Sequence, residues 1–268
     1  RNYMPHLTWS QYTGYTEQMP TMKVWRKLAG QGKLNAVQAR YFQPTKPVEE
    51  LYDTAADPHQ IRNLAGNAKY KPVLERMRRE LRAWMQRTHD LGLLGEYEMH
   101  RRAAGSTPYQ LARDKKKHPQ ERLMAAADAA NAMDPQKLPQ LLKLLADAEP
   151  AVRWWAAVGL TALGKAAAPA AGALERVMED DNPLVRVAAA EAMCNLGKHD
   201  KALPVLIRGL QDKTPFIRLR AINVLDRIGD RARAALPQIK KAKMKGIFPA
   251  DYLNRMTQYV PRKLSAAR

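Results

Sequence analysis

The chain has 268 residues and a formal net charge of +19 at pH 7, with 46% hydrophobic residues and one cysteine. This length and apolar share predict two compact units. The lone cysteine excludes an internal disulfide. We see no run of 18 apolar residues, so we expect no membrane-spanning segment. The positive charge predicts affinity for polyanions, with nucleic acid and a sulfated or otherwise anionic polysaccharide as the candidate classes.

The first hundred residues contain no internal repeat. They begin Arg1-Asn2-Tyr3-Met4 without an initiator methionine or an apolar leader, so we expect a piece of a longer or processed protein. Residues 20–30 predict a short helix, and residues 49–53 predict a short strand before a turn at Asp57-Pro58. Residues 73–91 predict a second helix with one apolar side, formed by Val73, Leu74, Met77, Leu81, Trp84 and Met85.

Short motifs in this region resemble the C-terminal subdomain of the sulfatase family. Glu49-Glu50-Leu51-Tyr52-Asp53 follows Pro47 and precedes Asp57-Pro58 and Asn63-Leu64-Ala65. Arg1-Asn2-Tyr3, Gln18-Met19-Pro20-Thr21-Met22 and Gln38-Ala39-Arg40-Tyr41-Phe42 are similar to bacterial polysaccharide-type sulfatases. The resemblance covers residues 1–95 and implies a small α+β subdomain, a sheet with one packed helix, that completes an N-terminal catalytic domain absent from this chain.

The resemblance also implies chemistry that this chain does not supply. Sulfatases use a formylglycine made from the first residue of C/S-x-P-x-R, beside a calcium-type ion held by carboxylates. Cys194 is followed by Asn-Leu-Gly-Lys, and Ser106-Thr107-Pro108-Tyr109-Gln110 has glutamine in place of the arginine. The six histidines show no zinc spacing. We therefore expect no catalytic residue, metal site or cofactor in this chain, and assign formylglycine and calcium to the missing domain.

Four residues are candidates for substrate binding because the resemblance puts them nearest the missing domain: Arg1, His6, Lys23 and Arg26. They could face a sulfate or a carboxylate. The alternative, which we favour, is that each is a surface charge or an interdomain contact.

Residues 96–118 mix Gly, Ser and Pro with a lysine run, so we expect a linker. Beyond it a motif recurs at steps of 33 and 32 residues: Asp147-x-x-Pro150-x-Val152-Arg153, Asp180-x-x-Pro183-x-Val185-Arg186 and Asp212-x-x-Pro215-x-Ile217-Arg218. Each copy ends its first helix at a glycine (Gly164, Gly197, Gly229) and carries an alanine (Ala156, Ala189, Ala221) where neighbouring helices would approach closely. A degenerate copy precedes them at residues 119–145.

This pattern resembles the HEAT-repeat family over about residues 119–240. It implies that residues 119–268 form an α-solenoid of about four repeats with a C-terminal tail, and that the chain is mainly α. The repeated charges Asp147, Arg153, Asp180, Arg186, Asp212 and Arg218 could form a ladder that grips an anion. We favour a structural role, in which each arginine pairs with an aspartate of its own or the adjacent repeat, because the two charges recur together.

Two lysine clusters are the candidate polyanion-binding residues: Lys115, Lys116 and Lys117, and Lys240, Lys241, Lys243 and Lys245. A single cluster of this kind is most often a solvated face, but together with the clusters Arg76-Met77-Arg78-Arg79 and Arg101-Arg102 they predict affinity for polyanions.

Three functions remain open. The first is the C-terminal part of a sulfuric-ester hydrolase, periplasmic or extracellular, whose solenoid binds a sulfated glycan or a protein partner. The alternative is a non-enzymatic HEAT scaffold that binds nucleic acid or an acidic partner. The third is a HEAT-type DNA glycosylase, which would need aromatic residues to hold a damaged base. Only Trp154 and Trp155 suggest this function.

Overall fold

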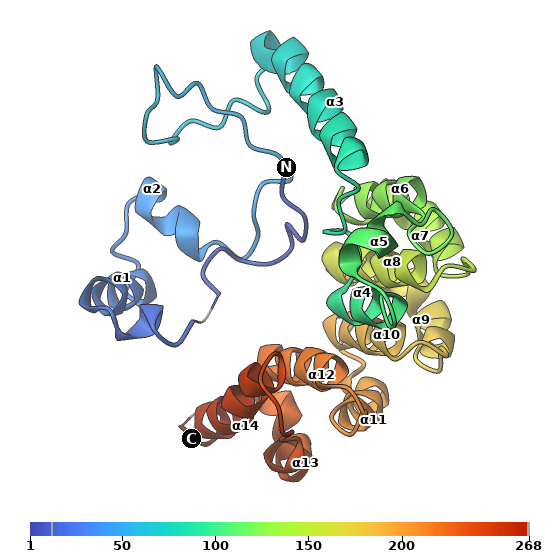
Figure 1. The fold of residues 1–268 in the computed structure, drawn as a ribbon. Helices are drawn as coiled ribbons and strands as arrows, with labels where there is room; N and C mark the ends of the chain where they lie inside the picture. Colours follow the sequence, from blue (N-terminus) through green and yellow to red (C-terminus); the bar gives the residue numbers. More distant parts are fainter. Residues whose placement is uncertain (12, 267–268) are drawn as a thin grey trace. The chain divides into compact units, whose positions relative to one another are not determined.

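A computed structural model describes residues 1–11 and 13–266 and divides the chain into two compact units, residues 1–85 and 86–268 (Figure 1). The first unit contains η1 (Thr16–Gln18), α1 (Pro20–Gly30), α2 (Ala36–Ala39), η2 (Arg40–Phe42), η3 (Ala68–Tyr70) and most of α3 (Lys71–Arg87). The second contains α4 (Glu96–Arg102), α5 (Pro108–Arg113), α6 (Gln120–Ala130), η4 (Pro135–Lys137), α7 (Leu138–Leu144), α8 (Pro150–Leu163), η5 (Gly164–Ala170), α9 (Ala171–Val177), α10 (Pro183–Asn195), α11 (His199–Gly209), α12 (Pro215–Arg227), η6 (Gly229–Ala235), α13 (Leu236–Lys241) and α14 (Ala250–Ala266).

The strand expected at residues 49–53 does not form, and neither does the expected α+β subdomain, since the described residues contain helices but no β-strand. The side chain of Asn63 occupies the positions that a neighbouring strand would take. It accepts from the Leu51 amide at 3.0 Å and donates to the Glu49 carbonyl at 3.0 Å. One further main-chain bond, from the Leu64 amide to the Leu51 carbonyl at 2.7 Å, completes the contact. An amide side chain satisfies the backbone here without a repeating ladder.

The two long helices of the first unit form where the sequence predicts them, but they bury little. Helix α1 has the predicted bounds, yet none of its residues is fully buried and Val24 is 57% exposed. Helix α3 ends at Arg87 rather than at residue 91, because His89 takes a left-handed φ of 54° that a helix cannot continue through. Only Leu74 and Met85 of its apolar side are buried.

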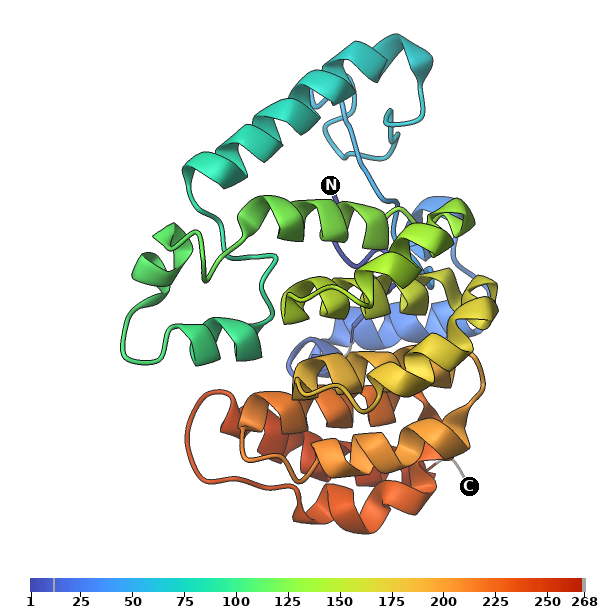
Figure 2. The same ribbon diagram turned by 90° about the vertical axis from the view of Figure 1, so that its right-hand side faces the viewer.

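The second unit is a stack of helix pairs. The first helices of successive repeats, α6, α8, α10 and α12, pack side by side, and α14 packs on α12 (Figure 2). Pro150, Pro183 and Pro215 open three of these helices at the first turn, where a missing N–H is tolerated. Gly164, Gly197 and Gly229 have positive φ values of 53°, 76° and 57° just after the helix ends. The predicted α-solenoid is thus confirmed.

Small residues let these helices approach closely. Ala156, Ala189 and Ala221 are completely buried. A Cβ added at Gly159 would lie 2.8 Å from the Ala130 Cα and 2.7 Å from a Leu141 methyl carbon, so the α6–α8 contact requires glycine. Close packing of this kind leaves no room for larger side chains.

One stretch of the stack, residues 150–177, is long and apolar enough to cross a membrane by length and composition, with a mean hydropathy of 1.3. The sequence expectation of no such stretch is therefore too strict. In the structure most of α8 is buried among its neighbouring helices.

Residues 91–118, which include the expected linker at residues 96–118, form a segment of the second unit that we call the strap. It contains α4 and α5 and buries Leu93, Leu94, Glu98 and Leu111. The Trp155 indole of α8 donates to the Leu93 carbonyl at 2.8 Å. Asn182, just before α10, donates to Glu98 at 2.6 Å, and His100 stacks on Phe216 of α12 with ring centroids 4.7 Å apart. The strap therefore contacts three successive repeats.

Candidate polyanion-binding site

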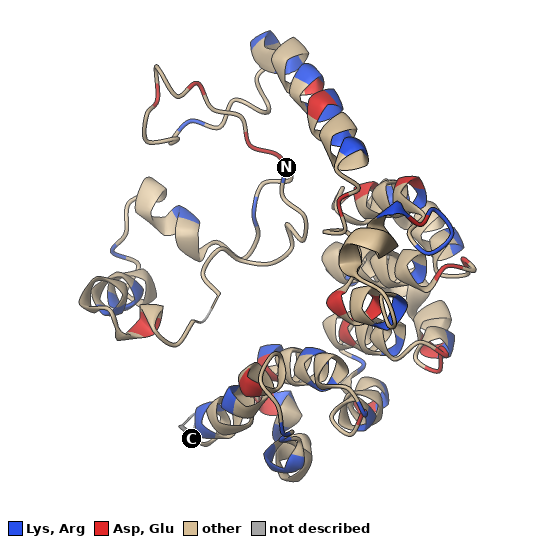
Figure 3. Ribbon diagram, in the orientation of Figure 1, with Lys and Arg blue, Asp and Glu red and all other residues tan. Residues whose placement is uncertain are grey.

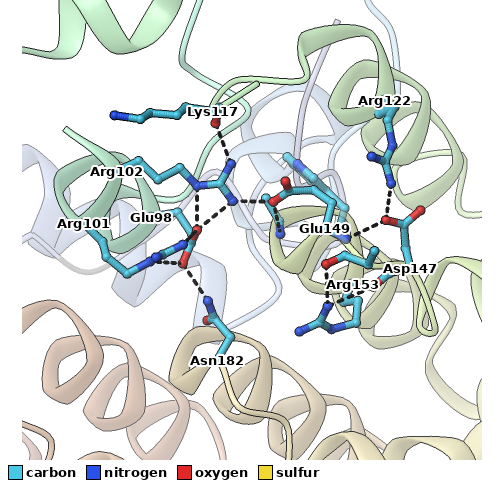
Figure 4. Close-up of polar contacts among 12 residues, drawn as sticks. Glu98, Arg101, Arg102, Lys117, Arg122, Asp147, Glu149, Arg153 and Asn182 are labelled. Atoms are coloured by element: carbon cyan, nitrogen blue, oxygen red, sulfur yellow. Dashed lines mark hydrogen bonds and ion pairs between the residues drawn. The ribbon is translucent and has the colours of Figure 1, made fainter. Parts of the chain in front are cut away.

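A buried carboxylate organises the strap. Glu98 is 1% exposed on α4 and accepts hydrogen bonds from Arg101 at 2.9 and 3.1 Å, from Arg102 at 2.7 Å and from Asn182 at 2.6 Å (Figure 4). Burial opposes its ionisation, but the hydrogen bonds from Arg101 and Asn182 and the charge of Arg102 hold the pKa of Glu98 below its usual range. An ionised Glu98 fixes both arginines in place.

Arg102 connects α4 to the next parts of the chain. Its guanidinium donates to the Lys117 carbonyl at 2.7 Å and forms an ion pair with Glu149 (Figure 4). Glu149 caps α8 by accepting from the Ala151 amide at 3.1 Å. The arginine is only 8% exposed, so it acts as a tie inside the unit rather than as a free charge.

The turn that follows α5 presents the first lysine cluster. Asp114 accepts from the amides of Lys116 at 3.0 Å and Lys117 at 3.2 Å, which holds the turn in shape. The side chains of Lys115, Lys116 and Lys117 are exposed. Lys116 and Lys117 join Arg101 and Arg102 around an open pocket of about 470 Å³, with Glu149 at its wall. Two basic clusters that are separate in sequence therefore meet in one place.

A second pocket, of about 610 Å³, includes Lys115, His118 and Arg122 in its lining. His118 is 3% exposed, and neither of its ring nitrogens has a hydrogen-bond partner. Burial, followed by the charge of Arg102, lowers the pKa of His118, so its ring is neutral at pH 7. A neutral imidazole can donate from one nitrogen to a bound oxygen. The sequence analysis missed His118, whose only signal is its place after the lysine run.

The ladder arginines are engaged inside the stack. Each donates to the carbonyl of the aspartate that opens its own repeat, at distances of 2.8 Å (Arg153 to Asp147), 2.6 Å (Arg186 to Asp180) and 2.5 Å (Arg218 to Asp212). Arg153 also pairs with Asp180 of the next repeat at 2.7 and 2.8 Å. In the degenerate repeat Arg122 pairs with Asp147 (Figure 4). The ion pairs of Arg122 and Arg153 bind one repeat to the next. Arg186 and Arg218 depart from the expected pairing, because they donate to main-chain carbonyls rather than to an aspartate carboxylate.

The other predicted site residues belong to other segments of the chain. Lys240, Lys241, Lys243 and Lys245 are exposed at the end of α13 and in the loop after it. Figure 3 shows basic residues along both units.

In the first unit Arg26 forms a two-point ion pair with Glu17 at 2.5 Å and donates to Ser10 at 2.9 Å. Lys23 is exposed on the same helix, Arg1 lies 5.6 Å from the Tyr3 ring centre, and His6 is half-buried.

The residues considered for formylglycine chemistry, Cys194 and Ser106, and for base binding, Trp154 and Trp155, have structural roles. Burial, then the charge of Glu191, raises the pKa of Cys194 to about 12, and Ser106 hydrogen-bonds Gln110 at 2.7 Å. Trp154 and Trp155 are 7% and 2% exposed and pack against each other, so they belong to the core rather than to a base-binding surface. Among the described residues no three His, Cys, Asp or Glu side chains are grouped to hold a metal ion.

Comparisons with known proteins find two similarities. A family model described as HEAT repeats matches residues 170–242. An ulvan-active sulfatase of Formosa agariphila is 38% identical over 99 residues, which is 37% of this chain but only 17% of that relative. The chain therefore spans less than a fifth of the curated relative that it matches, and no solved structure matches it.

Proposed function

We propose that the chain is the C-terminal part of a sulfatase that hydrolyses sulfate esters of a sulfated polysaccharide, with the HEAT stack as its binding platform. The observation that carries the proposal is the 38% identity over 99 residues to an ulvan-active sulfatase. The sulfatase-like motifs of residues 1–95 agree with it, and so does the net charge of +19, which favours an anionic substrate.

The exposed face of α3 supports the same proposal. Val73, Met77, Leu81 and Trp84 follow a spacing of four, four and three residues, which places them in one stripe along the helix. These side chains are 36–51% exposed. A contiguous exposed apolar face of this kind usually marks an interaction surface. In our proposal the catalytic domain of the longer protein covers it.

The chemistry in this proposal belongs to that catalytic domain, which brings the formylglycine and a calcium-type ion. Cys194 is buried and is followed by Asn-Leu-Gly-Lys rather than by the x-P-x-R of the motif, so it is no candidate for the formylglycine precursor. This chain supplies binding: the strap pockets with Lys115–Lys117 for sulfate groups, and Arg1, His6 and Lys23 as candidates nearest the catalytic domain. Arg26 is committed to Glu17 and has a structural part. A sulfated polysaccharide substrate places the protein in the periplasm or outside the cell.

The test is to express this chain together with the coding sequence that precedes it and to measure sulfate release from ulvan. We expect release that requires calcium and the Cys or Ser of an upstream C/S-x-P-x-R motif. Cys194→Ser and Ser106→Ala are the matched controls and should leave release unchanged.

The present chain alone should release no sulfate from ulvan or from aryl sulfates, with or without calcium. Turnover by the purified chain that survives both control substitutions would show that the catalytic groups lie within it. An upstream sequence without the motif, and a longer protein without activity, would favour the HEAT scaffold instead.

A further inference from the structure

A row of aromatic side chains runs from the strap to the last helix of the second unit. His100 of α4 stacks on Phe216 of α12, with ring centroids 4.7 Å apart. Phe216 meets Phe248 edge to face at 6.1 Å, and Phe248 meets Tyr252 of α14 at 5.9 Å. Phe248 and Tyr252 are 56% and 50% exposed. Large exposed aromatic side chains in contact with one another usually mark a binding surface.

The loop that bears Phe248 is held in place from two sides. Arg218 donates to the Ala242 carbonyl at 3.2 Å at the start of the loop. The side-chain amide of Asn254 accepts from the Met244 amide at 3.1 Å and donates to its carbonyl at 2.9 Å. These anchors fix the loop before any ligand binds, which lowers the conformational entropy lost on binding.

The same loop carries a concentrated positive charge. Lys240, Lys241, Lys243 and Lys245 are exposed on it and on the end of α13. The sequence contains no Asp or Glu between Asp230 and Asp251. Beyond the row, Arg255 lies 5.5 Å from the Tyr252 ring centre. A ligand at this surface would therefore meet aromatic faces and an excess of cations together.

We propose that the row His100, Phe216, Phe248 and Tyr252, with the lysines beside it, is a subsite for a sulfated polysaccharide chain. The apolar faces of sugar rings pack on the exposed aromatic rings, and sulfate groups pair with the lysines. This inference rests on the proposed function, which selects a polysaccharide over single-stranded nucleic acid, a polymer that also stacks on aromatic rings beside basic residues. The subsite would hold a long substrate away from the site of hydrolysis.

Binding of the purified chain to ulvan, to chemically desulfated ulvan and to a single-stranded DNA of matched charge tests the subsite. Phe248→Ala with Tyr252→Ala should weaken ulvan binding roughly tenfold, because two exposed stacking faces are lost together. The slope of log affinity against log salt should stay unchanged, because no charge is removed. Lys243→Gln with Lys245→Gln should instead reduce that slope. Tyr109→Ala removes an exposed aromatic outside the row and should have no effect.

Equal ulvan binding by the Phe248–Tyr252 variant and the parent, with circular dichroism unchanged, would overturn the subsite. DNA that binds more tightly than ulvan at physiological salt, and that loses affinity in the same variant, would assign the row to nucleic acid. The proposed function fails separately, through a longer protein without sulfate release. That failure leaves a measured preference for ulvan over desulfated ulvan intact.

Discussion

At the scale of single residues, Glu98 connects α4 to several other parts of the second unit. It is a nearly fully buried carboxylate that receives hydrogen bonds from two arginines and an asparagine. Removing one partner from such a group leaves uncompensated buried charge, which is more damaging than losing an exposed pair. The ends of the strap, the α8 cap and the α10 cap all depend on this one side chain.

Glu98→Gln should lower the free energy of unfolding of the second unit by about 1–3 kcal/mol, because Arg101 loses its carboxylate partner and Arg102 keeps only Glu149. Chemical denaturation followed by circular dichroism measures the change. Glu175→Gln is the control, since Glu175 pairs with Lys201 at 2.6 Å but is 49% exposed. It should cost less than about 1 kcal/mol. Equal losses in both variants would contradict the role given to Glu98.

The pH dependence of stability follows from the same residue. The folded pKa of Glu98 lies below its value in the unfolded chain, about 4.3 for a model glutamate. The stabilisation is therefore fully present above that value and is lost as the pH falls through the lower folded pKa. Denaturation curves at a series of pH values should show less loss of stability in acid for Glu98→Gln than for the parent. The same acid loss in both proteins would place the titrating group elsewhere.

At the scale of elements, the sequence predicts what local patterns determine. The repeat helices, their proline starts and their glycine ends are set by residues within one repeat, and the structure confirms them. Contacts between distant residues determine the rest. The strap has the composition of a linker, and contacts with distant residues make it part of the stack, such as those of Leu93 with Trp155 and of Glu98 with Asn182.

The candidate site was predictable to the same degree. The lysine run at residues 115–117 is visible in the sequence as a cluster. Its meeting with Arg101, and the orphaned ring of His118 beside it, depend on the path of the strap. The apolar side of α3 was predicted in part: the helical period was right, but Val73, Met77 and Leu81 remain 36–51% exposed.

Close helix contacts give a prediction at this scale. Ala156→Leu, Ala189→Leu and Ala221→Leu should each destabilise the stack by about 1–3 kcal/mol, because the added carbons have no space between neighbouring helices. Thermal melting measures the effect. Ala168→Leu, at an exposed position of η5, is the control and should melt like the parent. If the three core variants also melt like the parent, the helices do not touch at these alanines.

At the scale of the whole molecule, charge is the dominant property. A net charge of +19 gives any polyanion some affinity, so specific sites must be separated from the general field. Exposed lysines gather in the strap, at Lys115, Lys116 and Lys117, and also in the loop after α13. Salt dependence distinguishes a localised contact from a diffuse attraction, because each neutralised anion on the ligand releases counterions.

Converting Lys115, Lys116 and Lys117 to glutamine should weaken heparin binding and lower the salt slope by about one for each anionic contact removed. Affinity measured at several salt concentrations gives both quantities. Lys143→Gln, Lys165→Gln and Lys213→Gln together remove the same charge from exposed positions in three different repeats and form the control. Equal losses in the two triple variants would mean that the strap cluster is not a site.

The strap has a mechanical consequence. A solenoid behaves as a spring under tension, because each repeat contacts only its neighbours and small rotations between repeats add up. The strap joins α8, α10 and α12 through Leu93, Glu98 and His100, so pulling these repeats apart must also break contacts that bypass the repeat interfaces. The stack should therefore resist extension from α8 to α12. A polymer bound along these helices would lie on a surface whose shape changes little under load.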